Sequence, residues 1–202
     1  QLLQVVLGPI LSIGLHDGIQ RFFHEWSDDE RPRYVAALWM VSLVLSILVC
    51  GTLDWVGPWL FDKLFSQVPF DPYLRITLWA AFFTNLSAFP LAILRSRERL
   101  RTFSVVTILA FLSQATLTLY FVLGLDMGAQ GYLLGVLLSA ILMGGVYVFL
   151  MLRECRFKFT MRHILQPLGY SLPTVPVATL DGTASLFDRF FLDNNVPLAP
   201  IG

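Results

Sequence analysis

The stretch that decides the fold is Met127–Leu152, MGAQGYLLGVLLSAILMGGVYVFLML, which holds 26 residues and no charged side chain. A helix of about 20 residues is long enough to cross a hydrocarbon core about 30 Å thick. Unpaired backbone groups are costly in lipid, and the strict alternation of barrel strands is absent, so the stretch is predicted to be helical. Met127–Leu152 therefore predicts a transmembrane helix.

Other stretches of the chain lack charges in the same way. Tyr34–Leu53, Ile76–Leu94 and Thr102–Leu125 hold 20, 19 and 24 residues. Two shorter runs flank them, Gln1–His16 and Ile164–Leu180, and the first is interpreted as a helix cut by the start of the sequence rather than as a signal peptide. The predicted fold class is all-α, a polytopic integral membrane helical bundle with about six transmembrane helices.

Composition excludes other classes of protein. Hydrophobic residues make up 56% of the chain and charged residues 14%, against about 25% charged in a soluble domain. The 14 basic residues balance 14 acidic ones, which argues against disorder and against a nucleic-acid partner. Cys50 and Cys155 lie far apart and are predicted to be free thiols, and neither a metal site nor a cofactor is predicted.

Basic residues alternate between the connections. Eleven lie in the connections after the first, third and fifth predicted helices, and three lie elsewhere. The eleven are Arg21, Arg31, Arg33, Arg95, Arg97, Arg99, Arg101, Arg153, Arg156, Lys158 and Arg162, and the three are Lys63, Arg75 and Arg189. The positive-inside rule places the first group in the cytoplasm.

Turn and packing signals refine this bundle. The connection Asp54–Pro72 is predicted to hold a separate short amphipathic helix at the interface, where Trp55 and Trp59 serve as anchors, and a ligand-gating loop is the alternative. Leu125–Gln130 predicts a tight turn between two antiparallel helices, and Pro90 predicts a kink. A face of small residues is predicted for close helix packing, formed by Gly131, Gly135, Ser139, Gly144 and Gly145.

Ionisable residues inside predicted helices are the first functional candidates, because they are costly in lipid. Asp17 and Arg21 lie four residues apart on one helix face, and Asp181, Asp188 and Arg189 interrupt the last predicted helix. An alternative interpretation places the two arginines at helix ends, where they reach the headgroups, and treats Asp181 as an outward-facing or capping residue.

Uncharged polar residues form a second group of candidates. Thr107, Gln114 and Thr118 share a helical stripe, and Asn85 lies in a polar part of Ile76–Leu94. Such residues either line a cavity or hold helices together, and the second interpretation is the safer one for the stripe. Gln114 and Asn85 are retained as candidate cavity residues.

Enzymatic patterns are weak. Asp17–Arg21 resembles the start of a membrane phosphatidyltransferase signature, but the downstream glycine and paired aspartates are missing. The run Ser27–Glu30 is either a cation site or a solvated loop neutralised by Arg31 and Arg33. Since no catalytic triad or phosphate-binding glycine loop is visible, the prediction is that the protein is not an enzyme.

Three blocks of sequence carry a family resemblance. They are Ile13–Glu25 (IGLHDGIQRFFHE), Phe89–Arg99 (FPLAILRSRER), and Gly169–Pro176 (GYSLPTVP) followed by Asp188–Leu192 (DRFFL). In this order and spacing they resemble the second-, fourth- and seventh-helix segments of Wzx-type polysaccharide and O-antigen flippases. The resemblance covers nearly the whole sequence.

This resemblance implies a MATE-like multidrug/oligosaccharidyl-lipid/polysaccharide exporter fold, in which two six-helix lobes surround a cavity that opens alternately to each side. The sequence would be an internal fragment holding helices two to seven. Residues 1–163 would form most of the N-terminal lobe, and residues 164–202 the first helix of the C-terminal lobe.

The implied activity is the flipping of a polyprenyl-pyrophosphate-linked oligosaccharide, an O-antigen or capsule precursor, across the bacterial inner membrane. Arg21 and Arg189 would then bind the pyrophosphate, with Asp17, Gln114 and Asn85 as further cavity candidates. Asp181 and Asp188 are candidate coupling residues, although Asp181 lies outside the recognised pattern. The expected partners are this lipid-linked oligosaccharide, the lipid bilayer and polysaccharide polymerase machinery.

Three alternatives to flipping stay open. A multidrug or cation antiporter of the same fold would favour acidic cavity residues, and Arg21 argues mildly against it. A membrane enzyme acting on the same lipid would need converging carboxylates at the cytoplasmic interface. A membrane scaffold is the third alternative, because apolar helices alone do not prove transport.

Overall fold

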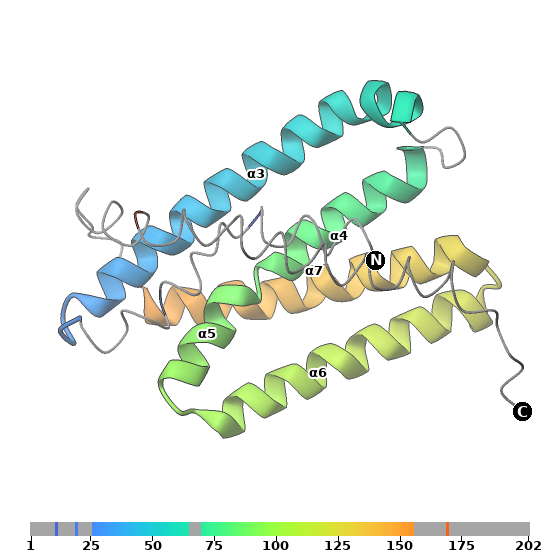
Figure 1. Cartoon of the computed structure of the whole chain (residues 1–202). Helices are drawn as coiled ribbons and strands as arrows, with labels where there is room; N and C mark the ends of the chain where they lie inside the picture. The colour runs from blue at the N-terminus through green and yellow to red at the C-terminus, as the bar shows by residue number, and fades with distance from the viewer. Residues whose placement is uncertain (1–10, 12–18, 20–25, 65–69, 156–168, 170–202) are drawn as a thin grey trace, which may run out of the picture.

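The computed structural model describes residues 11, 19, 26–64, 70–155 and 169. Within these ranges the chain forms helices and helical turns and no strand (Figure 1). In chain order the elements are α3 (Arg31–Leu64), the π-helical turn η1 (Phe70–Leu74), α4 (Arg75–Asn85), α5 (Ala88–Ser96), α6 (Leu100–Leu119), the π-helical turn η2 (Tyr120–Gly124) and α7 (Gly128–Glu154).

In the described part of the chain, four helical segments are long and apolar enough to cross a membrane. They are Arg31–Trp59, Phe70–Ser96, Leu100–Gly124 and Gly128–Glu154. Each coincides with one of the four long charge-free stretches to within one residue or contains it, so the prediction of an all-α polytopic membrane protein is confirmed. The two outer predicted helices, Gln1–His16 and Ile164–Leu180, lie outside the described residues except for Leu11 and Gly169.

Helix α3 is longer than its charge-free stretch, and the prediction of a separate interfacial helix after Leu53 is wrong. The helix continues past Pro58, and its last turns bend away from the main axis in Figure 1. Proline removes one backbone hydrogen bond and kinks a helix without always ending it. Gly57 is buried against the ring of Phe70, with which an added Cβ would collide, so this glycine permits packing rather than breaking the helix.

The spanning segment Phe70–Ser96 is broken between α4 and α5. Leu86 N–H donates to the Phe83 carbonyl at 3.2 Å and Ser87 N–H to the Thr84 carbonyl at 3.1 Å, so each bond reaches back only three residues. Pro90 lies four residues after Leu86, where its ring opposes the Leu86 carbonyl and no N–H is available to bind it. The interruption predicted from Pro90 is therefore present.

Helices α6 and α7 form the predicted antiparallel hairpin, which is visible in Figure 1. The turn consists of Leu125–Met127, and Asp126 adopts a positive φ of 54° there. Gly128, the first residue of α7, has a φ of 56°, a conformation that glycine adopts without a steric penalty. The short connection leaves the two helices side by side.

The small residues of α7 bring neighbouring helices close, as predicted. A Cβ added at Gly135 would lie 2.6 Å from the Thr118 Cα, and one added at Gly131 would lie 2.8 Å from the Phe121 carbonyl oxygen. Gly145, in contrast, is exposed and has no such neighbour within 4 Å, so its assignment to the packing face is wrong. Gly145 points away from the face on which Gly144 lies, because one helical turn takes about 3.6 residues and consecutive residues therefore point about 100° apart.

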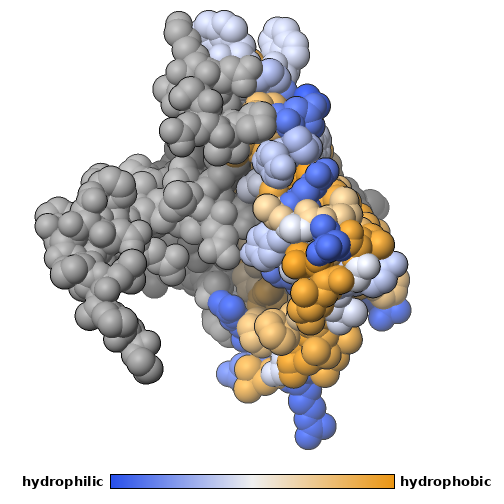
Figure 2. Space-filling view, turned by 90° about the vertical axis from the view of Figure 1, so that its right-hand side faces the viewer, coloured by the Kyte–Doolittle hydropathy of each residue, from blue (hydrophilic) through white to orange (hydrophobic). Residues whose placement is uncertain are grey.

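Burial is uneven across the bundle. One apolar cluster joins α3, α5 and α7 and includes Leu38, Phe89 and Met151. Of the 18-residue apolar window in the α6 segment, only 6% is buried, and large apolar side chains such as Phe111 are exposed. Figure 2 shows apolar residues on the surface of the described helices, as expected for surfaces that face lipid or further helices.

Replacing Gly135 with alanine is expected to destabilise the α6–α7 hairpin, because the new methyl group would overlap the Thr118 backbone. The expected loss is about 1–3 kcal/mol of unfolding free energy, measured by denaturation of the purified protein in detergent. Gly145→Ala is the matched control, and it is expected to be neutral or slightly stabilising. Equal effects of the two substitutions would contradict close packing at Gly135.

Candidate substrate cavity

Two of the seven predicted site residues, Asn85 and Gln114, lie in the described part of the chain. The structure therefore bears on these two positions. The other five lie outside the described residues and stay predictions: Asp17, Arg21, Asp181, Asp188 and Arg189.

Asn85 lies at the end of α4 and links this helix to α3. Its side-chain amide donates a hydrogen bond to the Ser46 hydroxyl at 3.2 Å, and this hydroxyl donates to the Leu11 carbonyl at 2.9 Å. Ser46 is buried, so these groups satisfy one another away from solvent. Asn85 thus takes part in helix packing and does not line the cavity around Gln114.

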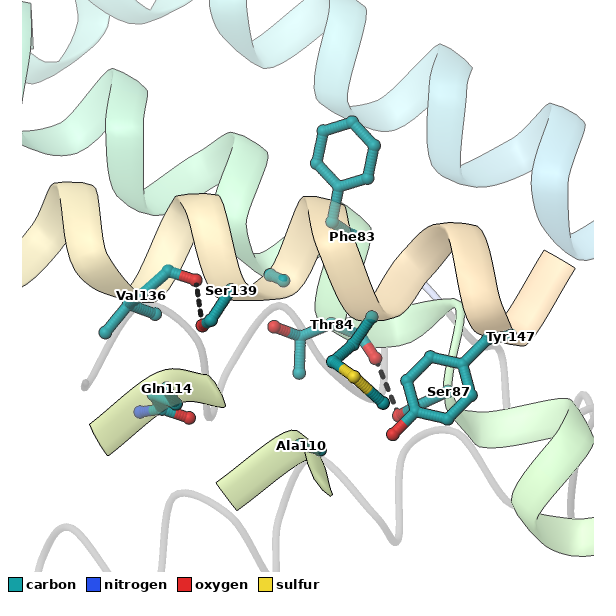
Figure 3. Close-up of a pocket in the computed structure, with 10 residues that line it drawn as sticks. Phe83, Thr84, Ser87, Ala110, Gln114, Val136, Ser139 and Tyr147 are labelled. Carbon is teal, nitrogen blue, oxygen red and sulfur yellow. Dashed lines mark hydrogen bonds between the residues drawn. The ribbon is translucent and has the colours of Figure 1, made fainter. Parts of the chain in front are cut away.

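Gln114 lines a cavity of about 80 Å³ between α4, α6 and α7 (Figure 3), which we call the central cavity. Its polar lining consists of Thr84, Ser87, Gln114, Ser139 and Tyr147, and the remaining lining residues are apolar. None of the residues that line it is charged. The cavity lies near the middle of the apolar stretches of these helices rather than at their ends.

The central cavity offers neutral hydrogen-bonding groups. The Ser87 hydroxyl already donates to the Thr84 carbonyl at 2.7 Å, and the Ser139 hydroxyl donates to the Val136 carbonyl at 2.8 Å (Figure 3). Both hydroxyl oxygens keep the capacity to accept, while the Gln114 amide can both donate and accept. This arrangement suits neutral hydroxyl-rich groups better than ions, because no countercharge is present.

A second, more open cavity of about 350 Å³ adjoins Gln114 on the α6–α7 hairpin. Thr118 and Tyr132 also line it. Thr107, the remaining member of the predicted stripe, is exposed and donates to the Phe103 carbonyl at 2.9 Å. The structure thus brings Gln114 and Thr118 together and leaves Thr107 outside both cavities.

Charged residues of the described chain gather at the ends of the bundle. At one end Arg97 pairs with Glu154 at 2.6 Å, which joins the α5–α6 connection to the end of α7. At the other end Arg75 pairs with Asp54 and Asp71, both at 2.8 Å. Two of the three connections that the charge alternation assigns to the cytoplasm, those after the third and fifth predicted helices, therefore meet at one end of the structure.

The acidic run before α3 is engaged with its neighbours. Asp28 pairs with Arg31 at 2.7 Å, and Glu30 accepts a hydrogen bond from the Ser27 hydroxyl at 3.1 Å. No group of three or more metal-ligating side chains is found among the residues that the structure describes. The contact with Arg31 agrees with the interpretation of this run as a neutralised loop.

Four long apolar helices that pack through small residues and expose large apolar side chains define a multi-pass helical membrane protein. A family model described as "polysaccharide biosynthesis protein" matches residues 5–193. The chain belongs to this family of polysaccharide biosynthesis proteins. A comparison with curated proteins and one with solved structures gave no match.

Tyr147 is a cavity residue that the sequence did not predict. Its side chain is 5% exposed and lines the central cavity from α7. The available signal is its spacing, because Ser139, Met143 and Tyr147 follow one another at intervals of four and share a helix face. That signal identifies a common face but not whether a cavity or a tightly packed neighbour lies against it.

Replacing Ser46 with alanine is expected to leave the Asn85 amide without its hydroxyl acceptor and to weaken the α3–α4 contact. The expected loss is about 1 kcal/mol of unfolding free energy, measured by denaturation in detergent. Thr52→Ala on the same helix is the control, because Thr52 is exposed and donates only to carbonyls of its own helix. A loss no larger than that of the control would argue against this link.

Burial and the neighbouring Glu154 raise the pKa of the Cys155 thiol to about 12, so little reactive thiolate forms near neutral pH. In a Cys50→Ala protein, we expect maleimide labelling of Cys155 to keep accelerating above pH 10. A cysteine introduced at exposed Ala129, tested in a protein lacking both native cysteines, should approach its plateau near pH 10, about one unit or more above the pKa of an ordinary thiol. A Cys155 plateau at the same pH as this control would contradict the raised pKa.

Proposed function

We propose that this protein flips a polyprenyl-pyrophosphate-linked oligosaccharide, a precursor of O-antigen or capsule, from the cytoplasmic to the outer leaflet of a bacterial inner membrane. The family supports a role in polysaccharide biosynthesis. The single observation that carries the step to flipping is the uncharged polar cavity around Gln114 within membrane-spanning helices. Sugar hydroxyl groups require hydrogen-bonding partners wherever they leave water.

The proposal assigns transport rather than catalysis to the protein. It includes a MATE-like exporter arrangement, with residues 1–163 in the N-terminal lobe and the chain from residue 164 beginning the C-terminal lobe. In this arrangement Arg21 and Arg189 bind the pyrophosphate, and Asp181 and Asp188 take part in coupling. The described helices contribute neutral groups for the glycan, with Gln114 as the main one, and polymerase machinery of the same pathway receives the product.

Complementation of a flippase-deficient bacterium with the complete protein tests this proposal. Gln114→Leu should lower surface glycan by about three- to tenfold, the loss expected for one or two neutral hydrogen bonds. Thr107→Val on the same helix is the matched control and should retain wild-type glycan, because Thr107 lies outside both cavities. Protein abundance in the membrane is measured for each variant.

Variants at the predicted charged sites extend the same test. Arg21→Ala and Arg189→Ala should abolish surface glycan if these residues bind the pyrophosphate, and Asp181→Ala should do so if it couples transport. Failure of the wild-type protein to restore glycan in several glycan backgrounds, together with raised drug tolerance, would instead support a multidrug antiporter. Wild-type glycan from a well-expressed Gln114→Leu protein would remove the role proposed for the central cavity.

A further inference from the structure

A separate cavity of about 200 Å³ lies at the end of the bundle predicted to be cytoplasmic. We call it the end cavity, and it lies between α5, α6 and α7. Apolar side chains that include Leu94 and Leu150 line one part of it, and Arg99, Thr102, Arg153 and Glu154 line another. It shares no lining residue with the central cavity, so it is a distinct site.

Positive charge exceeds negative charge around the end cavity. The Glu154 carboxylate pairs with Arg97 at 2.6 Å and with Arg99 at 3.6 Å. Arg153 packs its guanidinium over the Phe149 ring at 4.4 Å from the ring centroid. The lining itself holds two guanidinium groups, those of Arg99 and Arg153, against the single carboxylate of Glu154. Because Arg97, outside the lining, also neutralises this carboxylate, positive charge is in excess and the guanidinium donors suit phosphate oxygens.

The end cavity lies at the level of the lipid headgroups. Thr102 and Leu152 are the terminal residues of two long charge-free stretches, and Arg101 and Arg153 come directly beyond them. The positions where apolar helices give way to arginine mark the membrane interface. Leu100 and Leu152 are 65% and 52% exposed, so apolar surface for an acyl chain lies at the same level.

The first turn of α6 adds to the positive character of this site. It holds no acidic residue, and the side chain of the N-cap residue Arg99 makes no capping hydrogen bond to its backbone N–H groups. The start of a helix carries a partial positive charge that favours anions. This contribution supplements the arginine side chains and the cavity on which the site depends.

We propose that the end cavity binds the phosphate headgroup of an anionic phospholipid of the cytoplasmic leaflet. The arginines bind the phosphate, the Thr102 hydroxyl donates to it, and the apolar lining contacts the upper part of an acyl chain. We infer a phospholipid rather than the transported lipid, because no residue lines both the end cavity and the central cavity proposed for transport. The inference stands independently of the proposed transport activity.

Native mass spectrometry of the protein with phosphatidylglycerol or phosphatidylcholine tests the proposal. We expect one tightly retained phosphatidylglycerol per chain and about tenfold weaker retention of phosphatidylcholine. The double variant Arg99→Gln/Arg153→Gln should lower phosphatidylglycerol affinity by about tenfold or more. Arg101→Gln is the control, because Arg101 is exposed in the first turn of α6 and does not line the cavity, and it should retain wild-type affinity.

A variant with the opposite expected effect distinguishes loss of the binding site from misfolding of the protein. Glu154→Gln removes the competing carboxylate and should strengthen phosphatidylglycerol binding, which a damaged protein would not do. Equal losses in Arg101→Gln and in the double variant would overturn the proposal in favour of diffuse surface charge. Equal retention of both phospholipids would also overturn it.

Two further ligands distinguish the source of the phosphate group. Inorganic phosphate at millimolar concentration should fail to displace phosphatidylglycerol, because it lacks the acyl chain that contacts the apolar lining. Polyprenyl pyrophosphate should likewise fail to displace it at equimolar concentration. Displacement by inorganic phosphate would overturn lipid binding, and preferential displacement by polyprenyl pyrophosphate with the same arginine dependence would make the end cavity a substrate site.

Discussion

Close backbone contact along α7 is the interaction on which the described bundle depends. Lipid tails are as apolar as leucine, so helices in a membrane gain little from hiding apolar side chains and must instead pack tightly. Gly131 and Gly135 allow this contact with η2 and α6. Gly144 lies against side chains at the end of α4, where a Cβ would lie 3.4 Å from the Phe83 ring. Helix α7 therefore positions its neighbours on two sides.

The central cavity follows from how these contacts are spaced. Near one end of α6 the Thr118 backbone lies against Gly135, and near the other end Val106 packs with Met143 and Tyr147. Gln114 lies between the two contacts, where the helix pair leaves space that α4 borders. The polar side chain of Gln114 is tolerated at this position because the contacts on either side of it hold α6 and α7 together.

Much of this fold can be predicted from the sequence, because the residues that mark each spanning segment, break and turn lie within that element or next to it. The charge-free stretches identify four spanning segments, and Pro90 and Leu125–Gln130 identify where the chain breaks or turns. The end of α3 could not be identified in this way. Gly57 and Pro58 indicate a break, yet Phe70 packs on the glycine and the helix continues to Leu64, and this tertiary contact has no local signature.

The candidate site was less predictable, since polar residues in a spanning helix have two uses that look alike in sequence. Asn85 and Gln114 have similar side chains in similar apolar surroundings. Asn85 meets a buried hydroxyl on α3, whereas Gln114 lines two cavities, and only the relative placement of helices distinguishes these outcomes. The predicted charged residues Arg21 and Arg189 lie outside the described chain and remain predictions.

The distribution of charge separates two recognition tasks within the proposed mechanism. The described helices keep their ion pairs at the two ends of the bundle, where water and headgroups screen them, and keep the central cavity neutral. A neutral cavity can pass a glycan without holding it by charge, which would slow its release. Recognition of the pyrophosphate must then come from outside this cavity, which is the role proposed for Arg21 and Arg189.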